Sequence, residues 1–373
     1  MSWLSKLRPS RLWRETPREG LSHAEGHAPI TRDTLAAIKE LSRAVRNNPD
    51  AVEIYLALGN LFRSQGEMER AVRLREGLIA RPTLHKRFKA RAWFELGRDY
   101  KRAGFVERAV DAFSEARNIW GDTPELLLEL ARLHAEQGEF AAAAEHYRRL
   151  GHATAQAHYL VRQAELSRES SPSQARKALD KALAVFPGSV EAWSARLAGI
   201  MENPEKRGGD RLGPVMSQAY HAVDPKHRFA LLELVLAEIE TGEQARSLAG
   251  LLGTLCAEHP RDRFVVYYTG CALLMAGDLT LARERFEAAL DMDSEFWPAR
   301  LELVSLVLAE KQPKYGDSGY PELAEHLDFF LGQARRVKRF VCSQCGLKRE
   351  RVFFVCPRCH GWHSIAFRER LQD

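Results

Sequence analysis

Four glycines recur along the chain with the same neighbours, and this repeat constrains the fold more than any other feature. Gly66, Gly104, Gly138 and Gly277 each precede an alanine by five residues and follow a small residue by seven. The alanines are Ala71, Ala109, Ala143 and Ala282, and the small residues are Gly59, Gly97, Ala131 and Gly270. Small residues let two helices approach closely, and a glycine suits the turn between them. The pattern therefore predicts a series of helical hairpins.

Large residues complete the pattern four positions after the alanines, as Phe113, Tyr147 and Phe286. This combination is typical of tetratricopeptide repeats, so the predicted class is all-α. Weaker copies of the repeat extend over most of the chain. The predicted divisions are a basic leader and linker at 1–30, repeats at 31–201, a loop or hinge at 202–214, repeat-like helices at 215–337 and a small metal-binding ribbon at 338–373.

Two Cys-x-x-Cys pairs lie close together near the C-terminus and predict a metal site. The four thiolates of Cys342, Cys345, Cys356 and Cys359 would suit a tetrahedral ion, and a site with four protein ligands is structural. Zinc is the expected ion, and iron is the alternative. Gly346 fits the bend after the second ligand, where a positive φ is needed.

Other interpretations of the cysteine region stay open at this stage. Two disulfides are one of them, although nothing in the sequence indicates an oxidising compartment. His360 or His363 could replace one cysteine ligand. The apolar run Val352–Val355 predicts a short strand that leads into the second cysteine pair, with Trp362 packing beneath the site. The isolated Cys256 and Cys271 fit small core residues.

Charge is unevenly distributed along the chain. The net charge is +5, but residues 1–20 carry +3 and residues 335–373 carry +7, so the body between them is acidic. Trp3, Leu4 and Trp13 alternate with basic residues in the leader, which predicts either peripheral contact with an anionic membrane or a frayed basic segment. No apolar run is long enough for a transmembrane helix, and no signal peptide is recognisable.

A basic groove is predicted on the inner helices of the first repeats, where an acidic peptide or a terminal carboxylate would bind. The alternative is an ordinary solvated helix face. No Ser-His-Asp set, glycine-rich phosphate loop or paired acid is recognisable, which favours a protein that is not an enzyme. The predicted groove residues are Asn60, Arg63, Arg98, Lys101, Arg102 and Arg132.

The arrangement resembles the lipopolysaccharide assembly protein B family, in which tetratricopeptide repeats precede a rubredoxin-like metal domain. The residues that carry the resemblance are Leu58–Ala71, Leu96–Gly104, Arg339–Gly346 and Cys356–Ile365. The resemblance implies a non-enzymatic adaptor that presents the first committed deacetylase of lipid A synthesis to a membrane AAA protease. Members usually begin with a transmembrane helix, whereas residues 1–20 here are basic and contain prolines. The expected location is therefore cytoplasmic, with peripheral contact at the inner membrane.

Three other functions remain possible from the sequence. The chain could be a general interaction scaffold unrelated to lipopolysaccharide. It could bind nucleic acid through the basic ribbon, although the acidic body argues against a long nucleic-acid groove. An iron-loaded site could instead transfer electrons. The basic ribbon residues are Lys338, Arg339, Lys348, Arg349 and Arg351.

Overall fold

The computed structural model describes residues 32–48, 50–202, 212–310 and 321–370. These residues form helices throughout, followed by a small sheet, so the predicted all-α class with a C-terminal ribbon is confirmed. The chain divides into two compact units, an N-terminal unit within Pro17–Gln163 and a C-terminal unit that includes Ala164–Asp373. Among the described residues, no helix is both long and apolar enough to cross a membrane.

Several predicted segments fall wholly or mainly outside the described residues. They include the leader and linker at 1–30, most of the loop at 202–214 and nearly all of a second predicted loop at 312–321. Helix α12 (Leu212–Ala222) begins within the last residues of the first of these loops. Helix α18 (Pro321–Ala334) follows the second.

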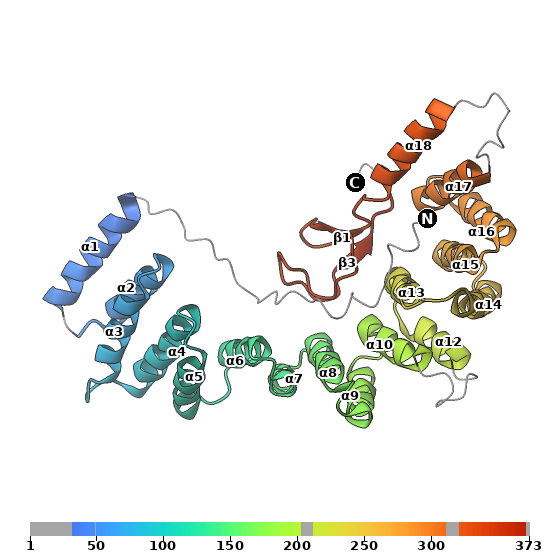
Figure 1. Ribbon diagram of the computed structural model, residues 1–373. Coiled ribbons are helices and arrows are strands. Elements are labelled where there is room, and N and C mark those ends of the chain that lie inside the picture. Colours follow the sequence, from blue (N-terminus) through green and yellow to red (C-terminus); the bar gives the residue numbers. More distant parts are fainter. Residues whose placement is uncertain (1–31, 49, 203–211, 311–320, 371–373) are drawn as a thin grey trace. The chain divides into compact units, whose positions relative to one another are not determined.

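The N-terminal unit is a succession of helices that pack in chain order as antiparallel hairpins (Figure 1). Helix α8 continues past the end of this unit, because the unit ends at Gln163. The helices are α1 (Arg32–Asn47), α2 (Val52–Ser64), α3 (Met68–Ile79), α4 (Lys86–Arg102), α5 (Val106–Trp120), α6 (Pro124–Glu136), α7 (Phe140–Arg149) and α8 (Ala153–Ser167).

The turn inside each hairpin depends on the repeated glycine. Gly66 between α2 and α3 has φ 79°, and Gly277 between two later helices has φ 85°. A residue with a Cβ rarely adopts this left-handed conformation, so glycine is the residue that ends one helix and begins the next at low cost. The predicted turns are confirmed at all four glycines of the repeat.

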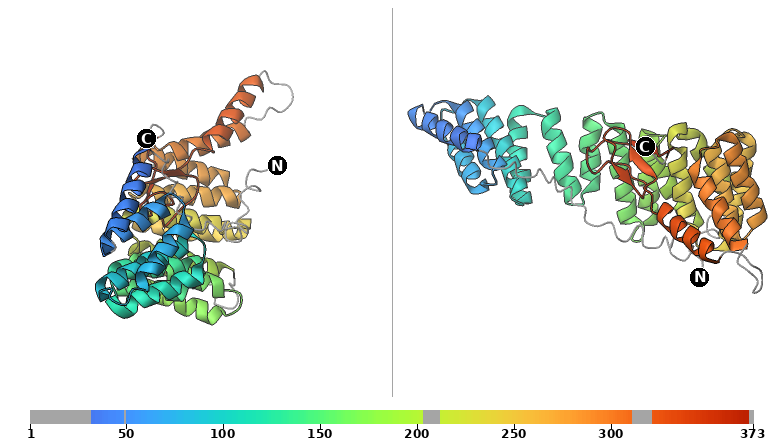
Figure 2. Two further views of the ribbon diagram at one scale, coloured as in Figure 1. Left: turned by 90° about the vertical axis from the view of Figure 1, so that its left-hand side faces the viewer. Right: turned by 90° about the horizontal axis from the view of Figure 1, so that it is seen from above.

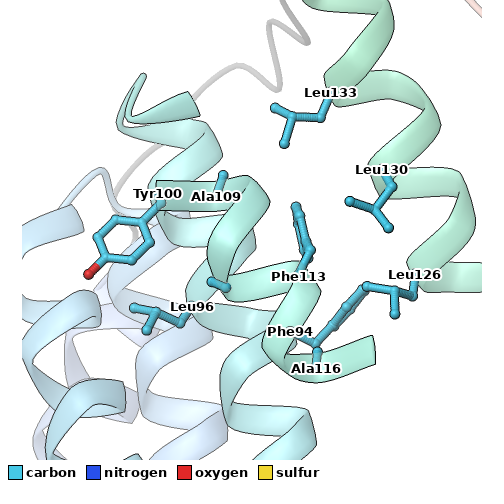
Figure 3. Close-up of a cluster of buried hydrophobic side chains, with 10 residues drawn as sticks. Phe94, Leu96, Tyr100, Ala109, Phe113, Ala116, Leu126, Leu130 and Leu133 are labelled. Atoms are coloured by element: carbon cyan, nitrogen blue, oxygen red, sulfur yellow. The ribbon is translucent and has the colours of Figure 1, made fainter. Parts of the chain in front are cut away.

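Small and large residues meet across each hairpin, as the repeat predicts. A Cβ added at Gly97 on α4 would lie 2.7 Å from the ring of Phe113 on α5. Figure 3 shows that Phe113 faces Leu126 and Leu130 of the next helix, and its ring centroid lies 5.7 Å from that of Phe94. The core is therefore continuous from hairpin α4/α5 to α6, because one aromatic ring fills the space that the glycine leaves open.

The C-terminal unit continues the helical array and ends in the ribbon. Its hairpins use the same packing, since a Cβ on Gly270 would lie 2.7 Å from Phe286. Its helices are α9 (Pro172–Val185), α10 (Val190–Met201), α12, the 3-10 helix η4 (Pro225–His227), α13 (Arg228–Ala237), α14 (Gly242–Glu258), α15 (Arg263–Ala276), α16 (Leu279–Met292), α17 (Trp297–Glu310) and α18.

The ribbon contains a three-stranded antiparallel sheet in the order β2-β1-β3. Its strands are β1 (Phe340–Cys342), β2 (Lys348–Arg349) and β3 (Ile365–Phe367). The predicted strand at Val352–Val355 is wrong, because β2 and β3 already occupy both edges of β1. Only Val355 forms a bridge there, with Trp362.

An aromatic cluster fixes the ribbon to the helices of the C-terminal unit (Figures 1 and 2). Phe340 of β1 stacks on Phe229 of α13 with ring centroids 5.9 Å apart. Phe367 of β3 packs against Phe264 of α15 at 5.2 Å, and the Trp297 indole donates a hydrogen bond to the Arg368 carbonyl at 3.0 Å. Phe229, Phe340 and Phe367 are almost completely buried, so the ribbon shares the hydrophobic core of the helical array.

Candidate metal centre and the predicted groove

The four predicted cysteines converge at one end of the ribbon. Their sulfur atoms all lie within 4.8 Å of one another, and the Cys342–Cys359 and Cys345–Cys356 pairs are each 3.6 Å apart. Sulfur atoms around a tetrahedral zinc ion, with Zn–S bonds of about 2.3 Å, lie about 3.8 Å apart. All four thiols are free, so the disulfide alternative does not describe this structure. The donor set and its spacing fit one metal ion.

The two Cys-x-x-Cys turns have matching backbone geometry. In the first, the Gly346 N–H donates to the Cys342 carbonyl at 2.8 Å. In the second, the His360 N–H donates to the Cys356 carbonyl at 2.8 Å. Gly346 has φ 71° and His360 has φ 56°, so both residues adopt the left-handed conformation directly after the second cysteine of their pair. The positive φ predicted for Gly346 is confirmed.

The cysteine turns receive support from Ser364 and Gln344. The Ser364 hydroxyl lies 3.2 Å from the Cys342 sulfur, and the Ser343 N–H donates to the Ser364 carbonyl at 2.7 Å. Burial opposes ionisation of Cys342, but the Ser364 hydroxyl and nearby backbone N–H groups outweigh it and lower the pKa of its thiol to about 6. A lowered pKa favours the thiolate, which is the form that binds metal. Sequence analysis did not identify either supporting residue.

Gly361 holds the two turns close together. A Cβ at this position would lie 2.0 Å from Oε1 of Gln344, a residue of the first turn. The position directly after His360 therefore requires a very small side chain. Among the described residues, the two histidines that could have replaced a cysteine have other contacts: His360 forms the backbone turn, and the ring of His363 packs edge-on against Phe186 at 5.1 Å.

An ion pair joins the ribbon to α13 beside the aromatic cluster. Nη2 of Arg339 lies 2.9 Å from Oε1 of Glu233, and the Tyr268 hydroxyl donates to the other carboxylate oxygen at 2.6 Å. The Glu233 carboxylate raises the pKa of Arg339. One of the five basic residues proposed for nucleic-acid binding is thus committed to an internal contact.

The predicted basic groove has a different character in the structure. Arg63 forms ion pairs with Glu95 at 2.8 Å and with Asp99 at 2.9 Å, and it also donates to Oδ1 of Asn60 at 3.0 Å. Its side chain is only 12% exposed. Asn60 and Arg63 therefore belong to an internal network of α2 and α4. This part of the prediction is wrong because the basic residues were counted without the carboxylates that face them.

The other predicted groove residues are also close to partners. Arg98 lies 3.6 Å from both Glu95 and Glu129, and Lys101 lies 3.2 Å from Glu129 and 3.4 Å from Glu136. Arg98 is the more exposed of the two, at 37% against 14%. Half-buried positions are also found for Arg102 and Arg132, and Arg132 acts on the Tyr147 hydroxyl. The surface carries both signs of charge.

Arg75 was not identified from the sequence, yet it is the most deeply buried charge of the network. Its side chain is 1% exposed, and it is paired with Asp99 and donates to Oδ1 of Asn60 at 2.7 Å. It follows Gly59 by the same interval at which Phe113 follows Gly97 and Phe286 follows Gly270. An arginine therefore occupies the position that is aromatic in the other hairpins. Burial lowers the pKa of Arg75 against the opposing effect of Asp99.

Comparisons with known proteins agree with this architecture. Residues 31–82 and 94–158 match the model of a tetratricopeptide repeat family. Lipopolysaccharide assembly protein B of Escherichia coli strain K12 is 26% identical over 332 residues, which cover 86% of this chain and 82% of that protein. The protein of the same name from Haemophilus influenzae is 25% identical over 340 residues, which cover 84% of this chain and 78% of that protein.

One solved structure also matches, although its similarity score is low. It is a tetratricopeptide repeat protein from Parabacteroides merdae, with a TM-score of 0.33 and 15% identity over 74% of this chain and 93% of that one. The sequence matches are more informative, because they continue through most of both chains. The chain is similar to lipopolysaccharide assembly protein B along most of its length, which confirms the resemblance predicted from its sequence.

Proposed function

We propose that this protein is a non-enzymatic scaffold that acts in lipopolysaccharide assembly. Tetratricopeptide hairpins present side chains of consecutive helices on one surface and are a common platform for protein partners. The relatives that match most of the chain carry the name lipopolysaccharide assembly protein B. These two observations support the same role from different directions.

The observation that carries most weight is the attachment of the cysteine ribbon to the helices. Phe340 and Phe367 are buried among aromatic residues of α13, α15 and α17, and the Arg339–Glu233 pair adds a charged contact. A ribbon that shares its core with the array cannot change position freely. One metal ion, zinc or iron, would be held by Cys342, Cys345, Cys356 and Cys359 and would stabilise the ribbon fold. Partners would then meet helices and ribbon as one surface.

In the more specific form of the proposal, the scaffold is an adaptor. It presents a lipid A biosynthetic enzyme, the first committed deacetylase, to a membrane AAA protease at the cytoplasmic face of the inner membrane. The family resemblance supports this form. The proposed domains remain those predicted from the sequence, with the leader at 1–30 in contact with anionic lipid. The groove residues Arg98 and Lys101 would contact an acidic segment of a partner.

Charge exchange makes such a contact physically reasonable. Arg98 lies 3.6 Å from each of its two carboxylate partners, which is longer than an optimal ion pair. Half-exposed ion pairs of this kind are worth only about 0–1 kcal/mol. An acidic partner could therefore replace Glu129 next to Arg98 at little cost. Arg63 and Arg75 are excluded from this role because their pairs are buried.

The decisive experiment follows the stability of the deacetylase in cells of the source organism. We expect a deletion strain to degrade the deacetylase several-fold more slowly, and the wild-type gene to restore the rate. Cys345→Ser should fail to restore it, because loss of one thiolate weakens metal binding and the ribbon fold. The matched control Cys271→Ala changes a cysteine away from the ribbon and should restore it. An unchanged half-life in the deletion strain would exclude the adaptor role.

The same strains separate the remaining alternatives. If crosslinked wild-type protein captures other envelope proteins while deacetylase turnover is unchanged, the scaffold role stands and the protease role does not. Arg98→Glu with Lys101→Glu should reduce capture at unchanged metal content. A red protein whose colour is bleached by reduction would instead favour iron and electron transfer.

A further inference from the structure

A second group of metal-binding side chains lies in the C-terminal unit, away from the cysteines. A ring nitrogen of His221, a carboxylate oxygen of Glu258 and a ring nitrogen of His259 all lie within 4.8 Å of one another. His221 is in the last turn of α12, Glu258 is the last residue of α14, and His259 caps that helix. Helices α12 and α14 pack against each other (Figure 1), so the fold itself brings these residues together.

The hydrogen bond of His221 leaves one ring nitrogen suitable for a metal. Its Nδ1 lies 2.7 Å from the Ser217 carbonyl oxygen. A carbonyl can only accept, so Nδ1 carries the proton and Nε2 keeps its lone pair. Histidine ligands in metal sites characteristically donate their other ring N–H to a backbone carbonyl in this way, which fixes the tautomer and the ring orientation.

His259 has an unsatisfied nitrogen at the same place. Its Nε2 is buried and has no hydrogen-bond partner among the described residues. Leaving a buried polar atom without a partner costs about 1–3 kcal/mol, so such an atom calls for an explanation. The rings of His221 and His259 are 5.1 Å apart and inclined by 54°, and a bound ion would satisfy the buried nitrogen.

The surroundings of the three residues favour a cation and hold the site in place. Two helices end there, and the partial negative charge of helix C-termini attracts positive ions. Tyr220, beside His221, is fully buried, donates a hydrogen bond to Asp262 and stacks under the Arg228 guanidinium at 4.3 Å. The end of α12 is therefore anchored, and only short side-chain movements would be needed to reach tetrahedral ligand spacings of about 3.3–3.6 Å.

We propose that His221, Glu258 and His259 form a second metal site that takes a divalent ion of the zinc class. Two imidazoles and one carboxylate are a ligand set that zinc accepts, with water in the fourth position. His221 and Glu258 are exposed, so an ion can enter from solvent. The bound ion would join the C-terminal ends of α12 and α14, which belong to neighbouring hairpins.

The test counts metal on the full chain. Protein whose cysteine site is already filled is dialysed against a slight excess of Zn²⁺, and bound metal is measured by elemental analysis. We expect two equivalents on the wild type and one each on His221→Ala, His259→Ala and Glu258→Gln. His326→Ala, which removes an exposed histidine of α18, should keep both. His221 and Glu258 are exposed, so these two variants should fold, and circular dichroism verifies this.

Cobalt distinguishes the two sites by their ligands. Co²⁺ bound to four cysteines shows intense thiolate charge-transfer bands, whereas two histidines and a carboxylate give only weak visible bands. Cys345→Ser should weaken the thiolate bands and keep the second equivalent, independently of the adaptor role. Binding of a single equivalent by the wild type would overturn the proposal, as would a second equivalent that survives in His259→Ala and His221→Ala alike.

Discussion

Two hairpins of the N-terminal unit solve the same packing problem with different chemistry. In hairpin α4/α5, Gly97 faces the ring of Phe113, and a Cβ there would lie 2.7 Å away. In hairpin α2/α3, Gly59 faces the guanidinium of Arg75, and a Cβ would lie 2.9 Å from it. Both groups are flat, so either can lie over a glycine. The guanidinium, however, carries a charge that must be neutralised when it is buried.

This difference makes one hairpin dependent on the other. Phe113 lies in a cluster of apolar side chains and needs no specific polar partner. Arg75 is neutralised by Asp99, which lies on α4 of the next hairpin. Buried ion pairs are weak evidence for stability, but they fix the register of the elements that they join. We infer that Arg75 and Asp99 specify how hairpin α2/α3 sits against α4.

The largest effect is expected from removing the acid of this pair. Asp99→Ala leaves Arg75 buried without its charge partner and also removes one of the two acidic partners of Arg63. Loss of one member of a buried ion pair costs about 3–5 kcal/mol. Urea unfolding followed by circular dichroism should show the midpoint moving to lower denaturant. A change below about 1 kcal/mol would mean that water replaces the carboxylate and that the pair does not specify register.

The sequence predicted the hairpins well and the charged network poorly, for a physical reason. The repeat is visible because glycine turns and small-to-large packing need particular residue types, such as Gly104 before Ala109. Ion pairs between hairpins depend on which helix faces face each other, and any Arg or Glu on a helix can be solvated or paired. Arg75 was missed because the pattern at its position is aromatic. The cysteine site was predicted because all its ligands lie in one short segment.

The ribbon shows the same limit. Cys-x-x-Cys spacing predicted the ligands and the bend at Gly346, and both agree with the structure. The run Val352–Val355 looked like a strand because it is apolar, but those residues are only partly buried and lie beside a filled sheet. The attachment of Phe340 and Phe367 to distant helices depends on tertiary contacts that no local pattern encodes.

A third hairpin, α6/α7, provides an intermediate effect, because it buries a titratable group that has no opposite charge paired with it in the described residues. Burial, together with the neighbouring His134, lowers the pKa of His146 from 6.5 to about 4. The folded state therefore disfavours the protonated ring, and its stability is lost as pH falls from about 6.5 towards 4. The full effect is about 3 kcal/mol. The charged groups around the ring are His134, Arg117, Arg149 and Asp122.

Unfolding at pH 7 and at pH 4.5 measures this dependence. His146→Leu should remove most of the stability difference between the two pH values, because it removes the group whose pKa differs between the states. His326→Ala, a change of an exposed histidine, should leave the difference as in the wild type. If His146→Leu retains the full pH dependence, other groups titrate instead, and this hairpin does not differ from the aromatic one in that respect.

The smallest effect, and the sharpest test of the comparison, is expected from giving the arginine hairpin the residue of the aromatic one. Arg75→Phe removes a buried charge, and Asp99 keeps its 2.9 Å pair with Arg63. Replacing a buried ion pair by a hydrophobic side chain of similar size is often neutral or stabilising, so we expect a change of about 0–1 kcal/mol.

The double variant then isolates the coupling between the two hairpins. Once Arg75 is Phe, Asp99→Ala strands no buried guanidinium at that position, and its cost should fall by about 1–3 kcal/mol relative to the single change. Denaturant titration of the four proteins in this cycle gives the coupling directly. Equal costs of Asp99→Ala in both backgrounds would show that the loss arises from Arg63 alone. The phenyl and guanidinium groups over the two glycines would then be interchangeable, and hairpin α2/α3 would be as independent of its neighbour as hairpin α4/α5.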